Sequence, residues 1–130
     1  MSSIITKIID LKKLIRSFQI ALKGLLFACK KEQTFRIQIM AGILAIFLTI
    51  CLNLSIIEKA LVYLAIAGVL GMELINTQIE KVLDLVQPTP HPDIKSIKDL
   101  SAAAVLIMAL GSLILGVIIF LPKILKIFNQ

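Results

Sequence analysis

Three side chains that could bind a metal ion or move a proton recur at helical spacing beside one of the most apolar stretches of the chain. Glu73, Asn76 and Glu80 follow the uncharged run from Ala60 to Met72. At about 100° per residue, the three side chains fall within about 60° of one another on one helical face. A carboxylate in the middle of a membrane helix costs roughly 2.5–3.5 kcal/mol, and less near the interface. Carboxylates kept at such a cost usually serve chemistry or ion binding, so this face is a candidate functional site.

The elements that position this face are predicted to be membrane helices. The chain has 130 residues, of which 58% are hydrophobic, and its mean hydropathy is +0.99. A soluble domain usually holds about 45–50% apolar residues. Spans across a bilayer need about 20 apolar residues, and residues 37–57, 60–79 and 100–121 meet that requirement. The composition therefore predicts an all-α integral membrane protein made of one domain, residues 1–130.

The remaining segments are predicted from their patterns. In residues 1–34, apolar residues recur every three or four positions with lysines between them, which is typical of an amphipathic helix on the membrane surface. Residues 80–99 are expected to form the loop between the second and third spans, although the second helix should continue as far as Val86. Three prolines at alternate positions, 88, 90 and 92, should then break it. The short polar stretch 53–59 predicts a tight hairpin between the first two spans.

Basic residues predict the orientation. Eight Lys and Arg residues precede the first span and three lie in the loop 80–99, against three on the opposite side. The positive-inside rule therefore places the N-terminus and this loop in the cytoplasm. The net charge of +6 is then mostly charge that faces the membrane. We expect no nucleic-acid partner, because neither a groove-reading element nor stacking aromatic residues are found.

Further polar residues are expected at the same cytoplasmic interface. Glu32 and Arg36 precede the first span, and Lys98 and Asp99 precede the third. Carboxylate and amide oxygens suit Mg²⁺, and lysines suit phosphate groups. Glu73, the most deeply placed carboxylate, is suited to act as a general base on a hydroxyl at the lipid surface. Together these groups indicate phosphoryl transfer to a lipid alcohol.

The residues alone leave other interpretations open. No glycine-rich nucleotide motif is present, so a proton or cation pathway through Glu73 and Glu80 competes with an enzyme, as does a purely structural helical oligomer. Glu32 and Arg36 could form a simple surface pair four residues apart. Asp84 could be a solvated charge at a helix end. Asp99 could be a favourable charge near a helix N-terminus.

One run of residues resembles a known family. Glu73-Leu-Ile-Asn-Thr-Gln-Ile-Glu80 is similar to the signature E-L-x-N-T-x-I-E of the small prokaryotic diacylglycerol kinases, a family that includes undecaprenol kinases. The similarity covers nearly the whole chain in the same order and spacing. Its other matching parts are Ser17-Phe18, Gly24, Glu32-x-x-Phe35-Arg36, Asp84-Leu-Val86, His91-Pro92, Lys98-Asp99 and Ser101–Val105.

The resemblance implies a homotrimer in the plasma membrane of a bacterium, each protomer having a surface helix and three spans. Active sites would lie between protomers at the cytoplasmic interface, with ATP and a membrane lipid alcohol as substrates. Glu73 would be the base, and Glu32 and Glu80 would hold Mg²⁺. The resemblance implies nucleotide contacts at Lys98, Asp99, His91 and Lys13, with Arg16 as a substitute for Lys13, and supporting roles for Asn76, Asp84 and Arg36.

Three positions depart from the family pattern. Gln78 replaces the usual alanine inside the signature, Gln38 stands where members often carry His or Glu, and Ile97 is bulkier than the usual residue. None removes a group that the reaction would require. The sequence does not decide between diacylglycerol and undecaprenol, although the Leu-Ile-Asn-Thr stretch and the Phe-Leu-Pro-Lys ending look more like the undecaprenol branch.

Overall fold

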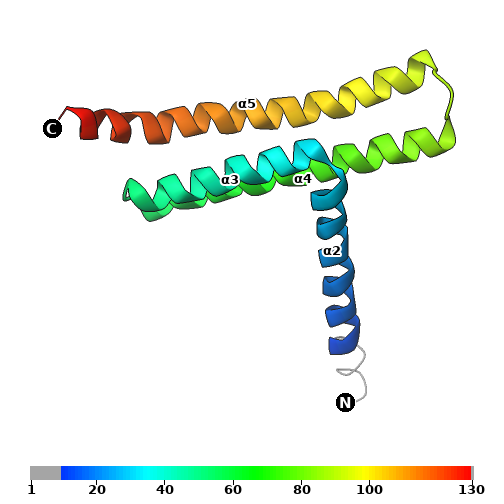
Figure 1. Ribbon diagram of the computed structural model, residues 1–130, viewed down its shortest axis with the longest axis horizontal. Coiled ribbons are helices and arrows are strands. Elements are labelled where there is room, and N and C mark those ends of the chain that lie inside the picture. Colours follow the sequence, from blue (N-terminus) through cyan, green and yellow to red (C-terminus); the bar gives the residue numbers. More distant parts are fainter. Residues whose placement is uncertain (1–9, 130) are drawn as a thin grey trace, which may run out of the picture. The chain divides into compact units, whose positions relative to one another are not determined.

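The computed structural model describes residues 10–129, and the ordered elements there are all helices (Figure 1). They are α2 (Leu11–Lys31), α3 (Gln33–Cys51), α4 (Ile56–Val86) and α5 (Pro92–Phe128). The chain forms two compact units, residues 1–36 and 37–130. The first nine residues, where the surface helix was expected to begin, lie outside the described residues.

Helix α2 begins and ends where side chains and backbone satisfy its terminal groups. The Asp10 carboxylate accepts from the backbone N–H groups of Lys12 and Lys13, at 3.0 and 3.3 Å. These are amides that the first turn of a helix leaves unpaired. At the other end Glu32 takes an extended conformation, and its N–H still donates to the carbonyl oxygen of Ala28 at 2.9 Å. An amphipathic helix therefore occupies most of the predicted segment.

The first two candidate spans, α3 and α4, are joined by the tight turn at residues 52–55. Asn53 adopts a positive φ of 47°, a conformation that asparagine tolerates better than most residues. Ser55 then starts α4 with a capping box: its hydroxyl accepts from the Glu58 N–H, and the Glu58 carboxylate accepts from the Ser55 N–H. The predicted hairpin is confirmed. Helix α4 begins at Ile56, within the stretch 53–59 that was expected to form the turn.

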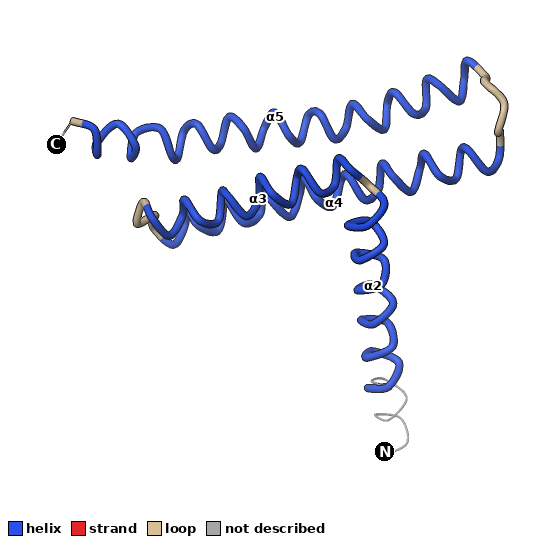
Figure 2. Tube along the Cα trace, viewed as in Figure 1, coloured by secondary structure: helices blue, strands red, loops and turns tan. Residues whose placement is uncertain are grey.

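Helices α4 and α5 pack along one another and are connected by residues 87–91 (Figure 2). The break falls at the prolines, as predicted, and Pro92 itself occupies the first turn of α5, where its missing N–H costs nothing. Most of the interval 80–99 is thus helical, since prolines rather than the end of the apolar stretch terminate α4. Helix α5 also continues through Pro122 to Phe128.

Packing within residues 37–129 is tight at a few points. Leu54, Val62 and Ile119 form a buried core at the hairpin end. Gly68 of α4 leaves room for the side chain of Met108 of α5, because a Cβ atom at this position would overlap the terminal methyl of Met108. At Gly42 of α3, a Cβ atom would lie 3.0 Å from the Cγ2 atom of Ile66 of α4, which is a tight contact.

The remaining apolar surface is largely exposed. Most of the large apolar side chains along α3, α4 and α5 lie on the outside of the described structure. All three helices are long and apolar enough to cross a membrane. A soluble domain would bury such side chains, so their exposure suits contact with lipid or with partner chains.

Candidate active site

Glu73 lies on the buried side of α4 and is held by a residue of α3. Its side chain is buried, with 6% relative exposure. The Gln38 Nε2 atom donates to the Glu73 Oε2 atom at 3.0 Å. A carboxylate can only accept when ionised, so the amide nitrogen is the end of Gln38 that faces it. A hydrogen bond to a charged group is stronger than one between neutral groups, and this one fixes the carboxylate between the two helices.

Asn76 and Glu80 form a second polar pair on the same helix. The Asn76 Nδ2 atom donates to the Glu80 Oε1 atom at 3.2 Å, across one helical turn. Asn76 is buried, whereas Glu80 is half-buried. The predicted alignment of Glu73, Asn76 and Glu80 therefore has a physical counterpart: two carboxylates along one helix, each bound by one amide.

The two amides have one free end each. The Oε1 atom of Gln38 and the Oδ1 atom of Asn76 are both buried without a hydrogen-bond partner in residues 10–129. An unsatisfied buried polar group costs about 1–3 kcal/mol. Both amide nitrogens already serve carboxylates, so the site offers acceptor oxygens and needs donors or a cation from outside. This is the chemistry of a site for a hydroxyl group or a metal ion.

Asp84 and Lys98 form an ion pair between α4 and α5. Both residues were predicted to serve the site, and the structure brings them together across the connection 87–91. Asp84 is 65% exposed and Lys98 is 31% exposed, so the lysine is the better shielded partner. The ion pair links the two helices close to their connection at residues 87–91.

His91 lies at the start of α5, whereas Asp99 lies within the helix. His91 is the N-cap of α5, and its Nδ1 atom accepts from the Asp93 N–H at 3.3 Å. In a neutral ring, this bond places the proton on the Nε2 atom. Because α5 begins at Pro92, Asp99 lies two turns inside the helix. The alternative that Asp99 serves as a charge at a helix N-terminus is therefore wrong, and Asp93 occupies that place.

The N-terminal unit holds the other predicted residues. Lys13 and Arg16 are exposed on α2. The Arg36 guanidinium donates to the carbonyl oxygens of Lys30 at 3.1 Å and Cys29 at 3.5 Å, which would otherwise be unpaired at the end of α2. Glu32 is the C-cap of α2 and has an extended backbone, directly before α3 begins at Gln33.

No ready-made metal centre exists within residues 37–129, where no three His, Cys, Asp or Glu side chains converge. Such a centre is not what phosphoryl transfer needs, because Mg²⁺ in these sites is usually held by one or two carboxylates together with phosphate oxygens. The Glu80 carboxylate and the unpartnered Asn76 oxygen are hard oxygen ligands of this kind. The donor set therefore fits Mg²⁺.

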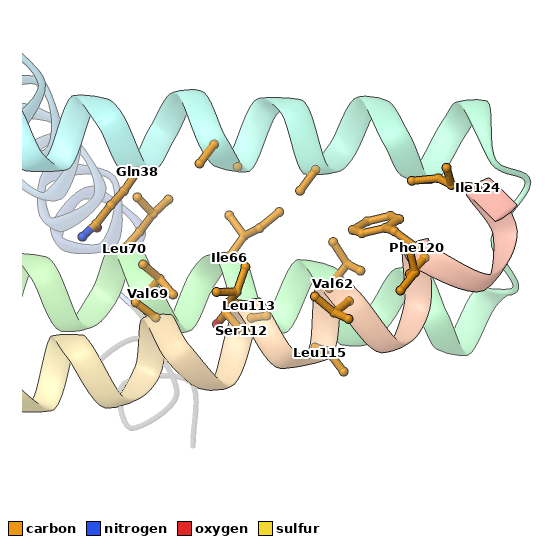
Figure 3. Close-up of a pocket in the computed structure, with 18 residues that line it drawn as sticks. Gln38, Val62, Ile66, Val69, Leu70, Ser112, Leu113, Leu115, Phe120 and Ile124 are labelled. Carbon is orange, nitrogen blue, oxygen red and sulfur yellow. The ribbon is translucent and has the colours of Figure 1, made fainter.

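An apolar cavity opens among α3, α4 and α5 (Figure 3). Its volume is about 560 Å³, and Gln38 lies at one end of it while Phe120 and Ile124 lie toward the other. Gln38 is thus shared between the cavity and the carboxylate of Glu73.

Helices that expose apolar surface and bury an amide-bound carboxylate define a multi-pass membrane protein with a polar site inside its bundle. The chain belongs to the prokaryotic diacylglycerol kinase family, whose family model matches residues 19–120. It is therefore a membrane lipid kinase, with ATP as the implied phosphate donor. The predicted all-α class, family and activity are confirmed, and the conducting oligomer that the residues alone left open is disfavoured.

Curated relatives agree with this assignment. An undecaprenol kinase of Bacillus subtilis (strain 168) is 36% identical over 115 residues, which cover 88% of this chain and 94% of that protein. A diacylglycerol kinase of Synechocystis sp. (strain ATCC 27184 / PCC 6803 / Kazusa) is 35% identical over 115 residues, covering 88% of this chain and 66% of that protein. The diacylglycerol kinase of Escherichia coli (strain K12) is 29% identical over 102 residues, 78% of this chain and 84% of that protein.

The contact between Gln38 and Glu73 is one that the sequence does not predict. In the sequence, Gln38 is only a departure from the family pattern without an assigned role. The available signal was its position, a polar residue near the start of an otherwise apolar first span. The partner could not be deduced, because Gln38 and Glu73 are 35 residues apart on different helices.

Proposed function

We propose that this lipid kinase transfers the γ-phosphate of ATP to the hydroxyl of diacylglycerol or undecaprenol, with Glu73 as the general base. The observation that carries the proposal is the burial of the Glu73 carboxylate between α3 and α4, where the Gln38 amide donates to it. A base that meets a membrane alcohol must lie at the depth of the alcohol's hydroxyl and be shielded from bulk water. The burial of Glu73 supports the second requirement, and its position at the end of the apolar stretch of α4 supports the first.

In the proposed reaction, the Glu73 carboxylate takes the proton of the alcohol as its oxygen attacks the γ-phosphorus. The bond from that phosphorus to the β,γ-bridging oxygen breaks, and ADP leaves. General-base assistance of this kind contributes typically about 10²–10⁴-fold in rate. The remaining catalysis comes from alignment of the reactants and from neutralisation of phosphate charge.

We assign the metal to Glu80 and Glu32, with Asn76 in support. Magnesium, when bound, would neutralise charge on the ATP phosphates. The Asn76 side chain holds the Glu80 carboxylate in place by its N–H group, and its own oxygen remains available as an additional ligand. Glu32, which belongs to the unit of residues 1–36, is assigned from the family resemblance.

For the nucleotide we assign Lys98, Asp99, His91 and a basic residue of α2, either Lys13 or Arg16. Asp84 and Arg36 have supporting roles: Asp84 through its ion pair with Lys98, and Arg36 through its cap on α2. This arrangement requires the N-terminus and the residues near the α4–α5 connection to face the cytoplasm of a bacterial plasma membrane, as the distribution of basic residues predicts.

We also propose that three copies of the chain form the active enzyme and that each site draws residues from two copies. The large exposed apolar surface of α3, α4 and α5 supports association within the membrane. Two inactive variants, Glu73→Gln and Glu32→Gln, test this when they are co-expressed. Shared sites predict that mixed oligomers recover part of the activity, whereas sites contained within one copy predict no recovery.

The central experiment measures phosphate transfer by the purified protein in lipid nanodiscs, with labelled ATP and with each alcohol in turn. Wild type should phosphorylate at least one alcohol, and Glu73→Gln should reduce kcat at least a hundredfold without a comparable change in the KM for ATP. Glu58→Gln is the matched control, since it neutralises a carboxylate at the other end of the same helix, where Lys123 contacts it at 2.9 Å. Equal rates for wild type and Glu73→Gln would exclude the proposed base.

A further inference from the structure

The hydrogen bond from α3 to the buried carboxylate implies a role for a residue outside the family signature. We propose that Gln38 is a positioning residue, whose amide binds Glu73 Oε2 and thereby directs Oε1 toward the hydroxyl of the lipid alcohol. The inference rests on the proposed role of Glu73 as the base. It adds a residue of another helix to the machinery that the signature on α4 supplies.

The geometry supports this assignment in two ways. The bond between Gln38 Nε2 and Glu73 Oε2 is 3.0 Å long and connects side chains that are 35 residues apart. Within residues 10–129, the Glu73 side chain is thus bound through one of its two carboxylate oxygens. A glutamate side chain has three rotatable bonds before its carboxylate, so packing alone would leave the choice of oxygen undetermined. Binding of one oxygen removes this freedom, as catalytic geometry requires.

The other end of Gln38 points to a ligand as well. Its Oε1 atom is buried and has no hydrogen-bond partner within residues 10–129. A glutamine that served only to link α3 to α4 would gain from satisfying both ends. The unpartnered oxygen lies on the residue that also lines the apolar cavity. An alcohol whose hydrocarbon part enters from the membrane therefore meets an acceptor oxygen beside the base.

The test compares Gln38→Met with Gln38→His. Methionine keeps the length and shape of glutamine and removes the donor, whereas histidine restores an N–H group. In nanodiscs, Gln38→Met should lower kcat at least tenfold and leave the KM for ATP within twofold of wild type. Gln38→His should be faster than Gln38→Met by at least the square root of the factor that Gln38→Met loses, which is about threefold for a tenfold loss. The same loss in Gln38→His as in Gln38→Met would overturn the proposal.

A double-variant cycle separates positioning from a general structural effect. If Gln38 acts through Glu73, then Gln38→Met should have no further effect on the residual rate of Glu73→Gln. Full additivity of the two changes would show that Gln38 acts elsewhere. The control is Gln19→Leu, a substitution of an exposed glutamine on α2, which should keep wild-type kinetics.

The outcomes distinguish this inference from the function on which it rests. A wild-type protein that phosphorylates neither alcohol would overturn the proposed function. A wild-type protein that is active, with Gln38→Met as fast as Gln19→Leu, would overturn the role of Gln38 alone. Thermal unfolding of each variant in the same nanodiscs accompanies the kinetics. If the loss in Gln38→Met follows a lowered unfolding temperature and is absent at temperatures where the variant is folded, the positioning role is also excluded.

Discussion

Lys98 of α5 forms an ion pair with Asp84 of α4, and the pair closes the five-residue connection between the two helices. The two side chains lie on separate helices, one proposed as a nucleotide contact and the other as its support. Exposed ion pairs contribute little to stability, typically about 0–1 kcal/mol. The pair is therefore better understood as a device that holds the lysine in one place than as a source of stability.

Neutralising each partner should separate these roles. We predict that Lys98→Gln raises the KM for ATP about tenfold, because the proposed charge-assisted contact to phosphate would be lost. Asp84→Asn should raise it less, about two- to threefold, since the lysine keeps its charge and loses only its restraint. Initial rates over a range of ATP concentrations measure both effects. Equal KM values for both variants and wild type would restrict the pair to a structural role.

Glu80 should control the metal requirement. Glu80→Gln removes the charge of the proposed metal ligand, whose carboxylate accepts from Asn76 at 3.2 Å, so the Mg²⁺ concentration for half-maximal activity should rise at least tenfold. Removal of Mg²⁺ with a chelator should abolish transfer in wild type. Asp93→Asn, which changes an exposed carboxylate in the first turn of α5, is the control. An unchanged Mg²⁺ dependence in Glu80→Gln would exclude it as a ligand.

His91 has a structural task that can be separated from a nucleotide contact. His91→Ala removes the N-cap of α5 and should destabilise the protein by about 1 kcal/mol, whereas His91→Asn keeps a capping side chain and most of the stability. If the free Nε2–H group also contacts ATP, both variants should raise the KM for ATP by a similar factor of about three. Thermal unfolding and ATP titrations distinguish the two effects. A KM change in His91→Ala alone would mean that helix fraying is its cause.

A side chain at position 68 should displace Met108. Gly68→Val places atoms against the terminal methyl of Met108, and because this flexible side chain can shift, the cost should lie at the low end of the range for overpacking, about 1 kcal/mol. Gly71→Val is the matched control on the same helix, because no heavy atom lies within 4 Å of a Cβ built there. Shortening the neighbour, in Gly68→Val with Met108→Ala, should recover part of the loss in unfolding temperature. A similar loss at both glycines would indicate a general cost of β-branching.

The helical architecture could be predicted because each signal in the sequence is local. The apolar windows predicted three spans, the prolines at 88, 90 and 92 predicted the break after α4, and the polar stretch after Cys51 predicted the hairpin. Helix ends that lie beyond the apolar segments were harder to predict. The interval 80–99 has the composition of a loop, yet α4 and α5 both extend into it because polar residues continue a helix until a proline or a cap ends it.

Only part of the site could be predicted for the same reason. Glu73, Asn76 and Glu80 share a helix, so their common face follows from periodicity. The contacts of Glu73 with Gln38, and of Asp84 with Lys98, join different helices and depend on how these pack. His91 as a helix cap was also missed, because histidine is not among the residues that usually favour this position.

Two ion pairs bracket α4 and α5: Asp84 with Lys98 near one end, and Glu58 with Lys123 near the other. At 1.5 Å per residue, Glu58 and Asp84 are roughly 39 Å apart along α4, which exceeds the hydrocarbon thickness of about 30 Å of a typical bilayer. A slide of one helix past the other by one turn, about 5.4 Å, would break both pairs at once. The two helices should therefore respond to a thinner membrane by tilting together, so that bilayer thickness changes the depth of Glu73 but not its register against α5.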